Sequence, residues 1–410
     1  MVVCLGRHYV YRFGLVGKTL LTYEICVFLT VTGAQQKQAR ARVLSRLEKK
    51  GPQMRRSGKM TIIASIVTLF MMLLTACGSS TSNTGGSSST PTKTAKTVAI
   101  VTDTGGINDQ GFNQLSYQGY TQALKEFGYK ERLIQTQSAS EYNANLTQAA
   151  QSAELVIAVG FLMETPLDTV AKQYPNTKFA IVDGCAVPVG KQDCETLPNV
   201  APLYFKEQEA GCLVGAIAGQ MELDGKSKIA KLLGKSTIGA VGGVSIPPVN
   251  HYIAGYKYCA QKVDPNVKVI INYSQDFSNT AKCKDIATSE INQNSADIIF
   301  QVAGGCGVGA LDAADQKGVF GIGVDSDQGY VHTSVLTSAL KRVNVAVYDT
   351  IKSFENGQYS NNPPTFDLKI NGVGYAAVSK DVPADAQAKA QDFLKQIQSG
   401  TLTPPDTIPA

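Results

Sequence analysis

The chain has 410 residues, enough for two domains of ordinary size, and its hydrophobic content of 43% suits a globular core. The formal net charge of +5 is unevenly distributed, because residues 1–76 carry twelve Lys or Arg and only two acids, a net charge of +10. Residues 77–410 therefore carry a net charge of −5, which argues against nucleic acid as a partner.

The first 76 residues are predicted to be a targeting region rather than part of a fold. Residues 1–53 have no recognisable pattern, and we interpret them as an upstream extension from a mis-assigned start, with Met54 the true initiator; the alternative is a genuine cytoplasmic extension. Residues 54–76 combine a short basic stretch with an apolar run, 61–74, that is too short to span a bilayer, which is typical of a signal peptide.

The apolar run ends in Leu-Thr-Ala-Cys-Gly at 74–78, which resembles the bacterial lipobox. In that motif the cysteine is acylated and becomes the new N-terminus, so Cys77 is the predicted lipidation site. A signal anchor or an ordinary cleavage site is the alternative. Residues 77–96 are rich in Ser, Thr and Gly and are expected to form a flexible tether from the lipid anchor.

Six cysteines follow Cys77, at positions 185, 194, 212, 259, 283 and 306. An even number in an exported chain predicts disulfides, and six cysteines allow fifteen pairings. We expect Cys185 to pair with Cys194 across a short loop and Cys259 to pair with Cys283. No CxxC spacing or histidine partner supports zinc, so no metal site and no cofactor are predicted.

From residue 97 onward, short apolar runs alternate with longer amphipathic segments. The predicted strands of a first series are 97–102, 133–136, 155–159, 178–182 and 200–204, with helices at 112–127, 142–152 and 165–174. A second series has strands at 237–241, 267–271, 297–302 and 318–324, with helices at 207–221, 252–262, 280–292 and 308–317. The tail is expected to form strands at 333–338 and 366–370 and helices at 341–354 and 384–397.

This alternation predicts an α/β protein with parallel sheets covered on both faces. The rhythm changes near Phe205, so two lobes are expected. Residues 97–204 with about 332–362 would form the first lobe, and 205–331 with about 363–410 the second. Several crossings would make a hinge and a cleft, and ligands of such sheets bind outside the carboxyl ends of the strands.

The loop after the first strand contains Gly105 and Gly106, followed by Asn108 and Asp109. A side-chain amide and a carboxylate could bond the edge of a heterocycle, but the same residues make Asx turns and helix caps, which the local pattern favours. Tyr117 could place its ring at the cleft or pack in the core.

Loops after later strands supply further candidates. Phe161 could stack on a flat ligand or pack in the core, and Asp183 could point into the cleft or serve as a turn residue. Gly304 belongs to a glycine-rich strand-to-helix loop, and Asp325 follows about twenty residues later. The spacing does not fit the GxGxxG dinucleotide motif, but Asp325 suits a vicinal diol.

Taken together, these segments resemble the basic membrane protein (BMP) family of ABC-transporter substrate-binding lipoproteins. The segments that carry the resemblance are 105–109 (GGIND), 112–114 (FNQ), 159–161 (VGF), 179–183 (FAIVD), 207–211 (EQEAG), 215–219 (GAIAG), 303–305 (AGG), 323–328 (GVDSDQ) and 337–341 (TSALK). The resemblance implies a type I periplasmic-binding-protein fold of two Rossmann-like lobes that close on a purine nucleoside. It also implies an ABC permease as partner.

Carried over by position, the resemblance implies that Asn108 and Asp109 read the base, that Tyr117 stacks on it, and that Asp183 and Asp325 hold the ribose near Lys341. The segment 242–248 departs from the pattern, because it lacks the Met or Phe expected there.

The expected function is a lipid-anchored, monomeric binding protein on the extracytoplasmic face of the membrane, without enzymatic activity. The alternatives are a surface sensor of the same fold, a nucleoside-cleaving enzyme, and a binding protein for a sugar or another polar solute.

Overall fold

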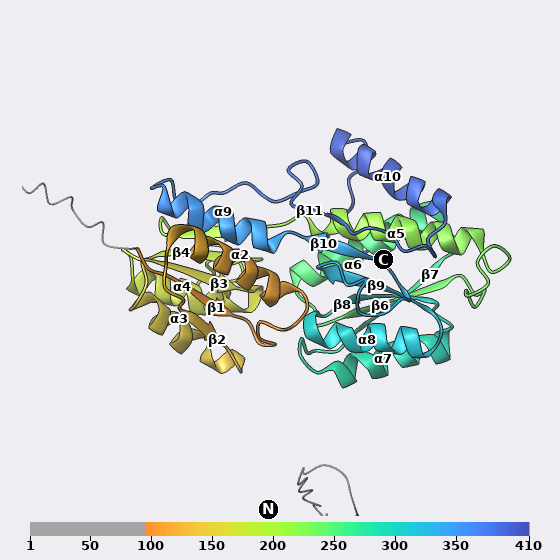
Figure 1. Cartoon of the computed structure of the whole chain (residues 1–410), viewed down its shortest axis with the longest axis horizontal. Helices are drawn as coiled ribbons and strands as arrows, with labels where there is room; N and C mark the ends of the chain where they lie inside the picture. The colour runs from red at the N-terminus through yellow and green to blue at the C-terminus, as the bar shows by residue number, and fades with distance from the viewer. Residues whose placement is uncertain (1–95, 410) are drawn as a thin grey trace, which may run out of the picture. The chain divides into compact units, whose positions relative to one another are not determined.

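The computed structural model describes residues 96–409, which lie within one compact unit, Ser89–Ala410 (Figure 1). The predictions for the upstream extension, the signal peptide, Cys77 and nearly all of the tether lie outside the described residues. Among residues 96–409, no helix combines the length and the apolar character that a membrane span requires.

The first sheet is parallel and has the strand order β2-β1-β3-β4-β5. Its strands are β1 (Val98–Thr102), β2 (Leu133–Gln135), β3 (Leu155–Val159), β4 (Lys178–Val182) and β5 (Val200–Leu203). Every residue of β1 and β3 is buried, as expected for apolar strands with helices on both faces.

The second sheet has six strands in the order β11-β10-β9-β8-β6-β7. They are β6 (Thr237–Gly242), β7 (Lys268–Tyr273), β8 (Ile298–Val302), β9 (Phe320–Asp325), β10 (Val335–Lys341) and β11 (Val373–Tyr375), of which only β11 runs antiparallel to its neighbour. Counted from β7, the first five strands repeat the order of the first sheet, with β6 in the place of β1 and β9 in the place of β4. The two lobes therefore have the same parallel architecture, and the expected two-lobed α/β fold is confirmed.

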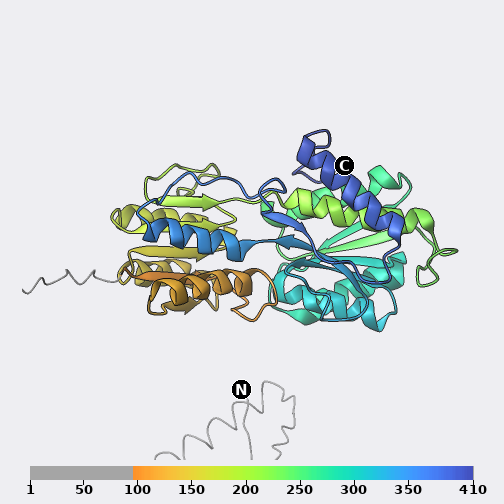
Figure 2. The same cartoon turned by 45° about the horizontal axis from the view of Figure 1, so that its top comes forward.

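Helices lie along both sheets (Figures 1 and 2). The first lobe has α2 (Phe112–Phe127), α3 (Tyr142–Ala150), α4 (Glu164–Gln173), α9 (Val343–Glu355) and the 3-10 turns η1 (Ala139–Glu141) and η2 (Phe161–Met163). The second lobe has α5 (Glu207–Asp224), α6 (Pro247–Val263), α7 (Thr280–Asn294), α8 (Gly304–Gln316) and α10 (Ala384–Ser399). Each of the predicted helices is present, with bounds that shift by a few residues.

The helices α5 and α6 pack with their backbones in contact. A Cβ on Gly211 would lie 2.1 Å from the carbonyl oxygen of Tyr252, and a Cβ on Gly255 would lie 2.0 Å from that of Gln208. Only glycine permits this approach. The disulfide between Cys212 and Cys259 joins the same two helices, so this pair forms a fixed scaffold.

The chain crosses between the lobes after β5, after β10 and after α9. Two expectations for this region are wrong. β10 pairs with β9, so the residues after 332 belong to the second sheet, and the chain enters the first lobe only at α9, which packs on α2 (Figure 2). The predicted strand at 366–370 is a single bridge between Phe366 and Phe205 followed by a turn, and the strand of this segment is β11.

The disulfide between Cys185 and Cys194 is confirmed, but the expected pairing of Cys259 with Cys283 is wrong. Cys259 pairs with Cys212, and Cys283 pairs with Cys306. The reason is tertiary, because each of these bonds joins two neighbouring helices, α5 to α6 and α7 to α8.

Candidate ligand-binding site

A cavity lies at the carboxyl ends of strands from both sheets and encloses about 610 Å³ of space, counting its opening to solvent. Its lining consists of Asp103, Thr104, Asp109, Phe112, Asn113, Gly160, Phe161, Asp183, Ile246, Pro248, Val249, Tyr252, Phe277, Val302, Gly304, Val324, Asp325 and Lys341. Six of the eight predicted site residues are therefore brought together, namely Asp109, Phe161, Asp183, Gly304, Asp325 and Lys341.

Lys341, at the end of β10, is the one lysine in the lining, and it is 2% exposed. Its Nζ lies 2.5 Å from Oδ2 of Asp183, which follows β4, and 3.4 Å from Oε1 of Glu207. Burial alone would lower the pKa of Lys341, but the carboxylates of Asp183, Glu207 and Asp325 outweigh it, so the pKa is raised. The ammonium therefore stays charged at neutral pH and is paired with protein carboxylates.

Asp183 lines the cavity and has one carboxylate oxygen without a partner in the part of the chain that the structure describes. Burial raises the pKa of Asp183 to about 7, an effect that Lys341 opposes and the charge of Glu207 reinforces. Its Oδ1 is buried and has no hydrogen-bond partner among the described residues. A buried acceptor without a donor is costly, and a ligand hydroxyl would satisfy it.

Asp325, the last residue of β9, is also buried. Its Oδ1 accepts a hydrogen bond of 3.1 Å from the Tyr252 hydroxyl. Burial raises the pKa of Asp325 to about 6, although Lys341 and Tyr252 lower it. Tyr252, on α6, is itself a lining residue and orients this carboxylate.

The loop after β1 combines turn-forming and lining roles. The Asp109 carboxylate accepts hydrogen bonds from the backbone N–H groups of Gly111, Asn113 and Gln114, which are 2.8 to 3.0 Å away. It therefore caps the start of α2, as the turn and helix-cap interpretation of this loop expected. It also lines the cavity. Asn108 is exposed and lies outside the lining.

Asp103 is a lining acid that the sequence did not single out. Oδ1 of Asp103 accepts hydrogen bonds from the hydroxyl of Tyr142 and from the backbone N–H of Thr104. Burial raises the pKa of its carboxyl group. Oδ2 lies beside Gly160, where a Cβ would approach it to 2.6 Å. Gly160, at φ +119°, thus keeps space open around this oxygen.

Aromatic rings form part of the lining from several loops. Phe112 opens α2, Phe161 opens η2, and Phe277 lies in the loop after β7. Tyr117 lies outside the lining, because its ring packs near Tyr120 and its hydroxyl donates to Glu131.

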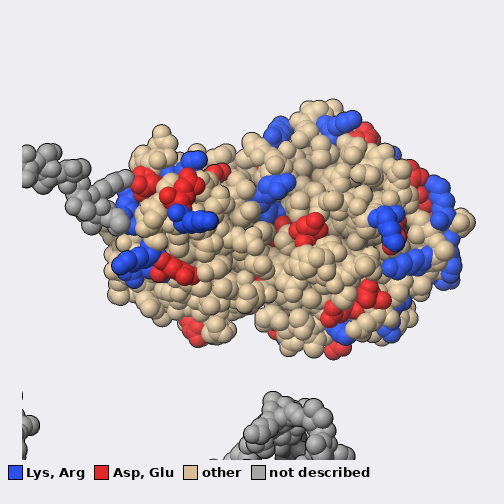
Figure 3. Space-filling view, viewed as in Figure 1, with Lys and Arg blue, Asp and Glu red and all other residues tan. Residues whose placement is uncertain are grey.

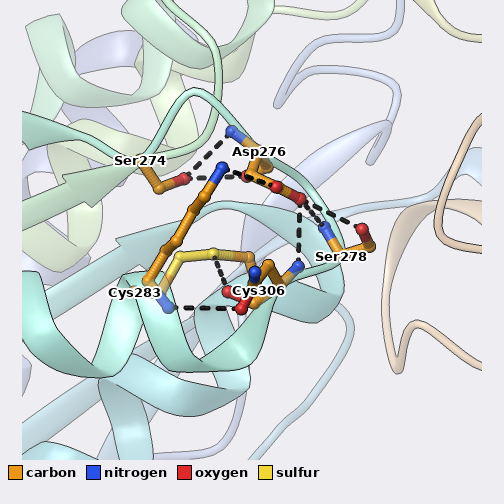
Figure 4. A network of polar contacts seen from close by, with 7 residues as sticks. Ser274, Asp276, Ser278, Cys283 and Cys306 are labelled. Atoms are coloured by element: carbon orange, nitrogen blue, oxygen red, sulfur yellow. Dashed lines mark hydrogen bonds and ion pairs between the residues drawn. A yellow bond between two sulfur atoms is a disulfide. The ribbon is translucent and has the colours of Figure 1, made fainter. Parts of the chain in front are cut away.

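Phe277 supplies the aromatic side chain that the segment 242–248 lacks. A Cβ on Gly243 would lie 2.3 Å from the Phe277 ring, so the missing side chain leaves the space that this ring occupies. Asp276 holds this loop (Figure 4), because it accepts a hydrogen bond from the backbone N–H of Ser278. It also accepts one from the backbone N–H of Asn279 and pairs with Lys282 at 2.9 Å.

The same loop is joined to the glycine-rich start of α8. The backbone N–H of Cys306 donates to the carbonyl oxygen of Phe277 at 3.0 Å, and the disulfide ties Cys306 to α7. The position of the Phe277 loop relative to Gly304, at the start of α8, is therefore fixed.

The two lobes are also bonded to each other beside the cavity. The backbone carbonyl of Gln110, in the first lobe, accepts a hydrogen bond of 2.6 Å from the Ser326 hydroxyl and one of 3.2 Å from Nε2 of Gln328. Gln328 is fully buried, and its Oε1 accepts from Gln301 and from the backbone N–H of Val324. These two interlobe bonds involve protein groups alone.

The lining is rich in hydrogen-bond acceptors, with four aspartates and a single, neutralised lysine. It is suited to an uncharged solute with several hydroxyl or amino donors and a flat apolar part. Within residues 96–409, no group of three or more His, Cys, Asp or Glu side chains could hold a metal ion. Over the first lobe, at the left of Figure 3, positive and negative side chains are intermixed.

Two similar parallel-sheet lobes with a polar and aromatic cavity between them define a solute-binding protein. Residues 96–407 match the Bmp family, described as ABC transporter substrate-binding protein PnrA-like, and the chain belongs to this family. Such proteins bind small solutes and work with membrane permeases.

Individual relatives agree with this assignment. An uncharacterized lipoprotein of Pyrococcus abyssi is 36% identical over 305 residues, which cover 71% of this chain and 72% of that protein. The ABC transporter nucleoside-binding protein BmpA of Lactococcus lactis subsp. cremoris is 30% identical over 370 residues, 84% of this chain and 97% of that protein. The crystal structure of an ABC transporter solute-binding protein from Aeropyrum pernix K1 is similar with a TM-score of 0.68 at 27% identity, covering 76% of this chain and 94% of that one.

Proposed function

We propose that this substrate-binding protein captures a nucleoside for an ABC importer. The observation that carries the proposal is the pair of buried carboxylates, Asp183 and Asp325, which face one cavity from opposite lobes beside a single buried lysine. Two fixed carboxylates can accept both hydroxyls of a ribose diol through charge-assisted hydrogen bonds, each worth about 1.5–3 kcal/mol. The name of the Lactococcus relative, a nucleoside-binding protein, supports the same ligand class.

The other lining residues would hold the base. Phe112, Phe161 and Phe277 offer ring faces for stacking on a flat heterocycle. Asp103, through Oδ2, would take the place that the resemblance gives to Asn108 in bonding the edge of the base. Asp109 would act by holding the loop. Because both lobes contribute contacts, the ligand favours the closed state, and closure follows from this difference in affinity.

We further propose that the protein is a monomer held at the extracytoplasmic face of the membrane by acyl chains on Cys77. The lipobox-like segment and the lipoprotein names of several relatives support this anchor. Labelling cells with a radioactive fatty acid should mark the protein, and Cys77→Ser should abolish the label and release the protein from the membrane fraction. A labelled Cys77→Ser protein would contradict this assignment.

Calorimetry tests the ligand class. We would titrate the purified Cys77→Ser protein, which cannot be acylated, with adenosine, guanosine, inosine, uridine and ribose. One-to-one binding of a nucleoside with no heat from ribose is expected. Binding of ribose as tight as that of any nucleoside would assign a sugar instead, and no heat from any of the five would move the ligand to another class of solute.

A further inference from the structure

We infer that Glu207 is a positioning residue of the binding site. It holds the ammonium of Lys341 and thereby influences how far Asp183 is ionised when it meets the ligand. Glu207 is absent from the cavity lining, and no role follows for it from the sequence. The inference rests on the proposed function for its ligand, but part of its test needs no ligand.

The contacts of Glu207 form a chain from the solvent side to the cavity. Oε2 lies 3.1 Å from Nδ1 of His251, which is half-buried on α6, and Oε1 lies 3.4 Å from Nζ of Lys341. Lys341 in turn contacts Asp183, which lines the cavity and whose second oxygen is buried without a hydrogen-bond partner among the described residues. Glu207 itself is 2% exposed, so removing its charge changes the field at Lys341 with little screening by water.

The scaffold keeps Glu207 in this place. Glu207 is the first residue of α5, where the positive end of the helix dipole favours a carboxylate. One turn later, Gly211 packs against the backbone of Tyr252, and Cys212 is bonded to Cys259. Because α5 and α6 cannot separate locally, Glu207 and His251 keep their positions relative to each other.

The charged and titratable groups around Lys341 come from four elements and one loop. They are Asp183 after β4, Glu207 at the start of α5, His251 and Tyr252 on α6, Asp325 at the end of β9, and Asp109 in the loop after β1. The negative charge of Glu207 raises the pKa of Asp183, whereas Lys341 lowers it. Without the negative charge of Glu207, the positive charge of Lys341 would stabilise the ionised form of Asp183 with less opposition, so the pKa of Asp183 would fall.

Glu207→Gln therefore has two opposite effects on the affinity for whichever nucleoside binds the wild-type protein. At about pH 8.5, where Asp183 is ionised in both proteins, the variant should bind roughly tenfold more weakly, because Lys341 is less firmly held. At about pH 6, wild-type affinity falls as Asp183 is protonated, and the variant should keep more of its affinity. The pH midpoint of binding moves to lower pH.

Two variants complete the experiment. Glu207→Asp keeps the charge and should restore the midpoint. Glu222→Gln makes the same chemical change at a buried position of the same helix, about 22 Å away, and should leave affinity and midpoint unchanged. If Glu207→Gln weakens binding by one constant factor at every pH, Glu207 has a structural role only and the inference is overturned.

A second readout separates this inference from the proposed function. In the ligand-free protein, NMR of carboxyl-labelled aspartates follows the titration of Asp183 directly, with Asp183→Asn to assign the signal. A lower midpoint in Glu207→Gln supports the inference even if no nucleoside binds, and an unchanged midpoint overturns it even if nucleosides bind.

Discussion

Asp183 and Asp325 occupy corresponding positions in the two lobes, at the carboxyl ends of β4 and β9, and both have left-handed backbones, with φ of +65° and +61°. A non-glycine residue in this region is strained, and such strain persists only where the surroundings enforce it. The same strained turn, repeated in two sheets of the same strand order, aims two carboxylates at one cavity.

Asp325→Ala should weaken nucleoside binding about 10–100-fold, because it removes charge-assisted hydrogen bonds to the ribose. Calorimetry of the variant beside the wild type measures the effect. Asp327→Ala, two residues further along the same loop and outside the lining, is the matched control and should bind normally. Unchanged affinity in Asp325→Ala would remove the ribose role of this residue.

The affinity should fall as the pH is lowered from about 8 to 5.5. The pKa values of Asp183 and Asp325 are raised to about 7 and about 6, so both carboxyls become protonated in this window and lose acceptor capacity. The stability of the ligand-free protein depends on pH in the opposite direction. The stability that a raised carboxyl pKa provides is complete below the ordinary pKa of 3.8 and is lost as the pH rises through 6 and 7.

Thermal unfolding with and without ligand measures both effects at once. The increase in Tm that a saturating nucleoside causes should grow from pH 5.5 to pH 8. An increase that is the same at both pH values would mean that neither carboxylate titrates in contact with the ligand.

Gly243→Ala should weaken ligand binding about tenfold with little change in Tm, because the new methyl group would displace the ring of Phe277 from the cavity wall. Gly374→Ala is the control: a Cβ there meets nothing within 4 Å, so its affinity should match that of the wild type. A Gly243→Ala protein with wild-type affinity would show that the ring position does not matter for binding.

Glu222→Gln should stabilise the ligand-free protein increasingly as the pH rises from 5 to 9. Burial raises the pKa of Glu222 to about 10, with the neighbouring Asp297 carboxylate as a further cause. Below its ordinary value of 4.5 the wild type has the full stabilising contribution of the protonated form, and this contribution is lost as the pH rises toward 10. The neutral amide cannot titrate, so the difference in Tm between variant and wild type should widen with pH; a constant difference would contradict this.

The disulfides should differ in what they contribute to stability. The pair Cys212–Cys259 spans 47 positions and Cys185–Cys194 only nine, and longer closed loops constrain the unfolded chain more. Replacing Cys212 and Cys259 by alanine should therefore lower the free energy of unfolding by about 1–2 kcal/mol more than replacing Cys185 and Cys194 does. Urea unfolding of the two double variants measures this difference. A larger loss for Cys185–Cys194 would assign that bond a role in the native state.

Much of the fold could be predicted from the sequence because each buried strand is a continuous apolar run followed by a turn. The rule that parallel strands present their carboxyl ends on one side of a sheet then located Asp183, Asp325 and Gly304 at the cavity. Patterns within a strand could not show that β10 extends the second sheet, since pairing depends on contacts between distant segments.

The side chains of the site were harder to predict than its loops. Tyr252 lies within a helix, where an aromatic residue is indistinguishable from core, and Phe277 fills a space that becomes visible only beside Gly243. Asp103 and Asn108 both follow β1, but only the geometry of the turn decides which one faces the cavity. Cys212 pairs with Cys259 because glycines let two helices touch, which no spacing of cysteines reveals.

The bonds from Ser326 and Gln328 to the carbonyl of Gln110 join the two lobes through protein groups and use no atom of a solute. If binding closes the lobes as proposed, these bonds would stabilise the closed form equally for every ligand, which would raise all affinities by a common factor and leave the ratios between solutes unchanged. On the proposed function, the lining would therefore decide selectivity, while these hydrogen bonds between the lobes would contribute to the lifetime of the loaded protein. On the proposed function, unloading to a permease would require these hydrogen bonds to break along with the other interlobe contacts, so substitutions at Ser326 and Gln328 would change the rate of unloading without altering which solute is chosen.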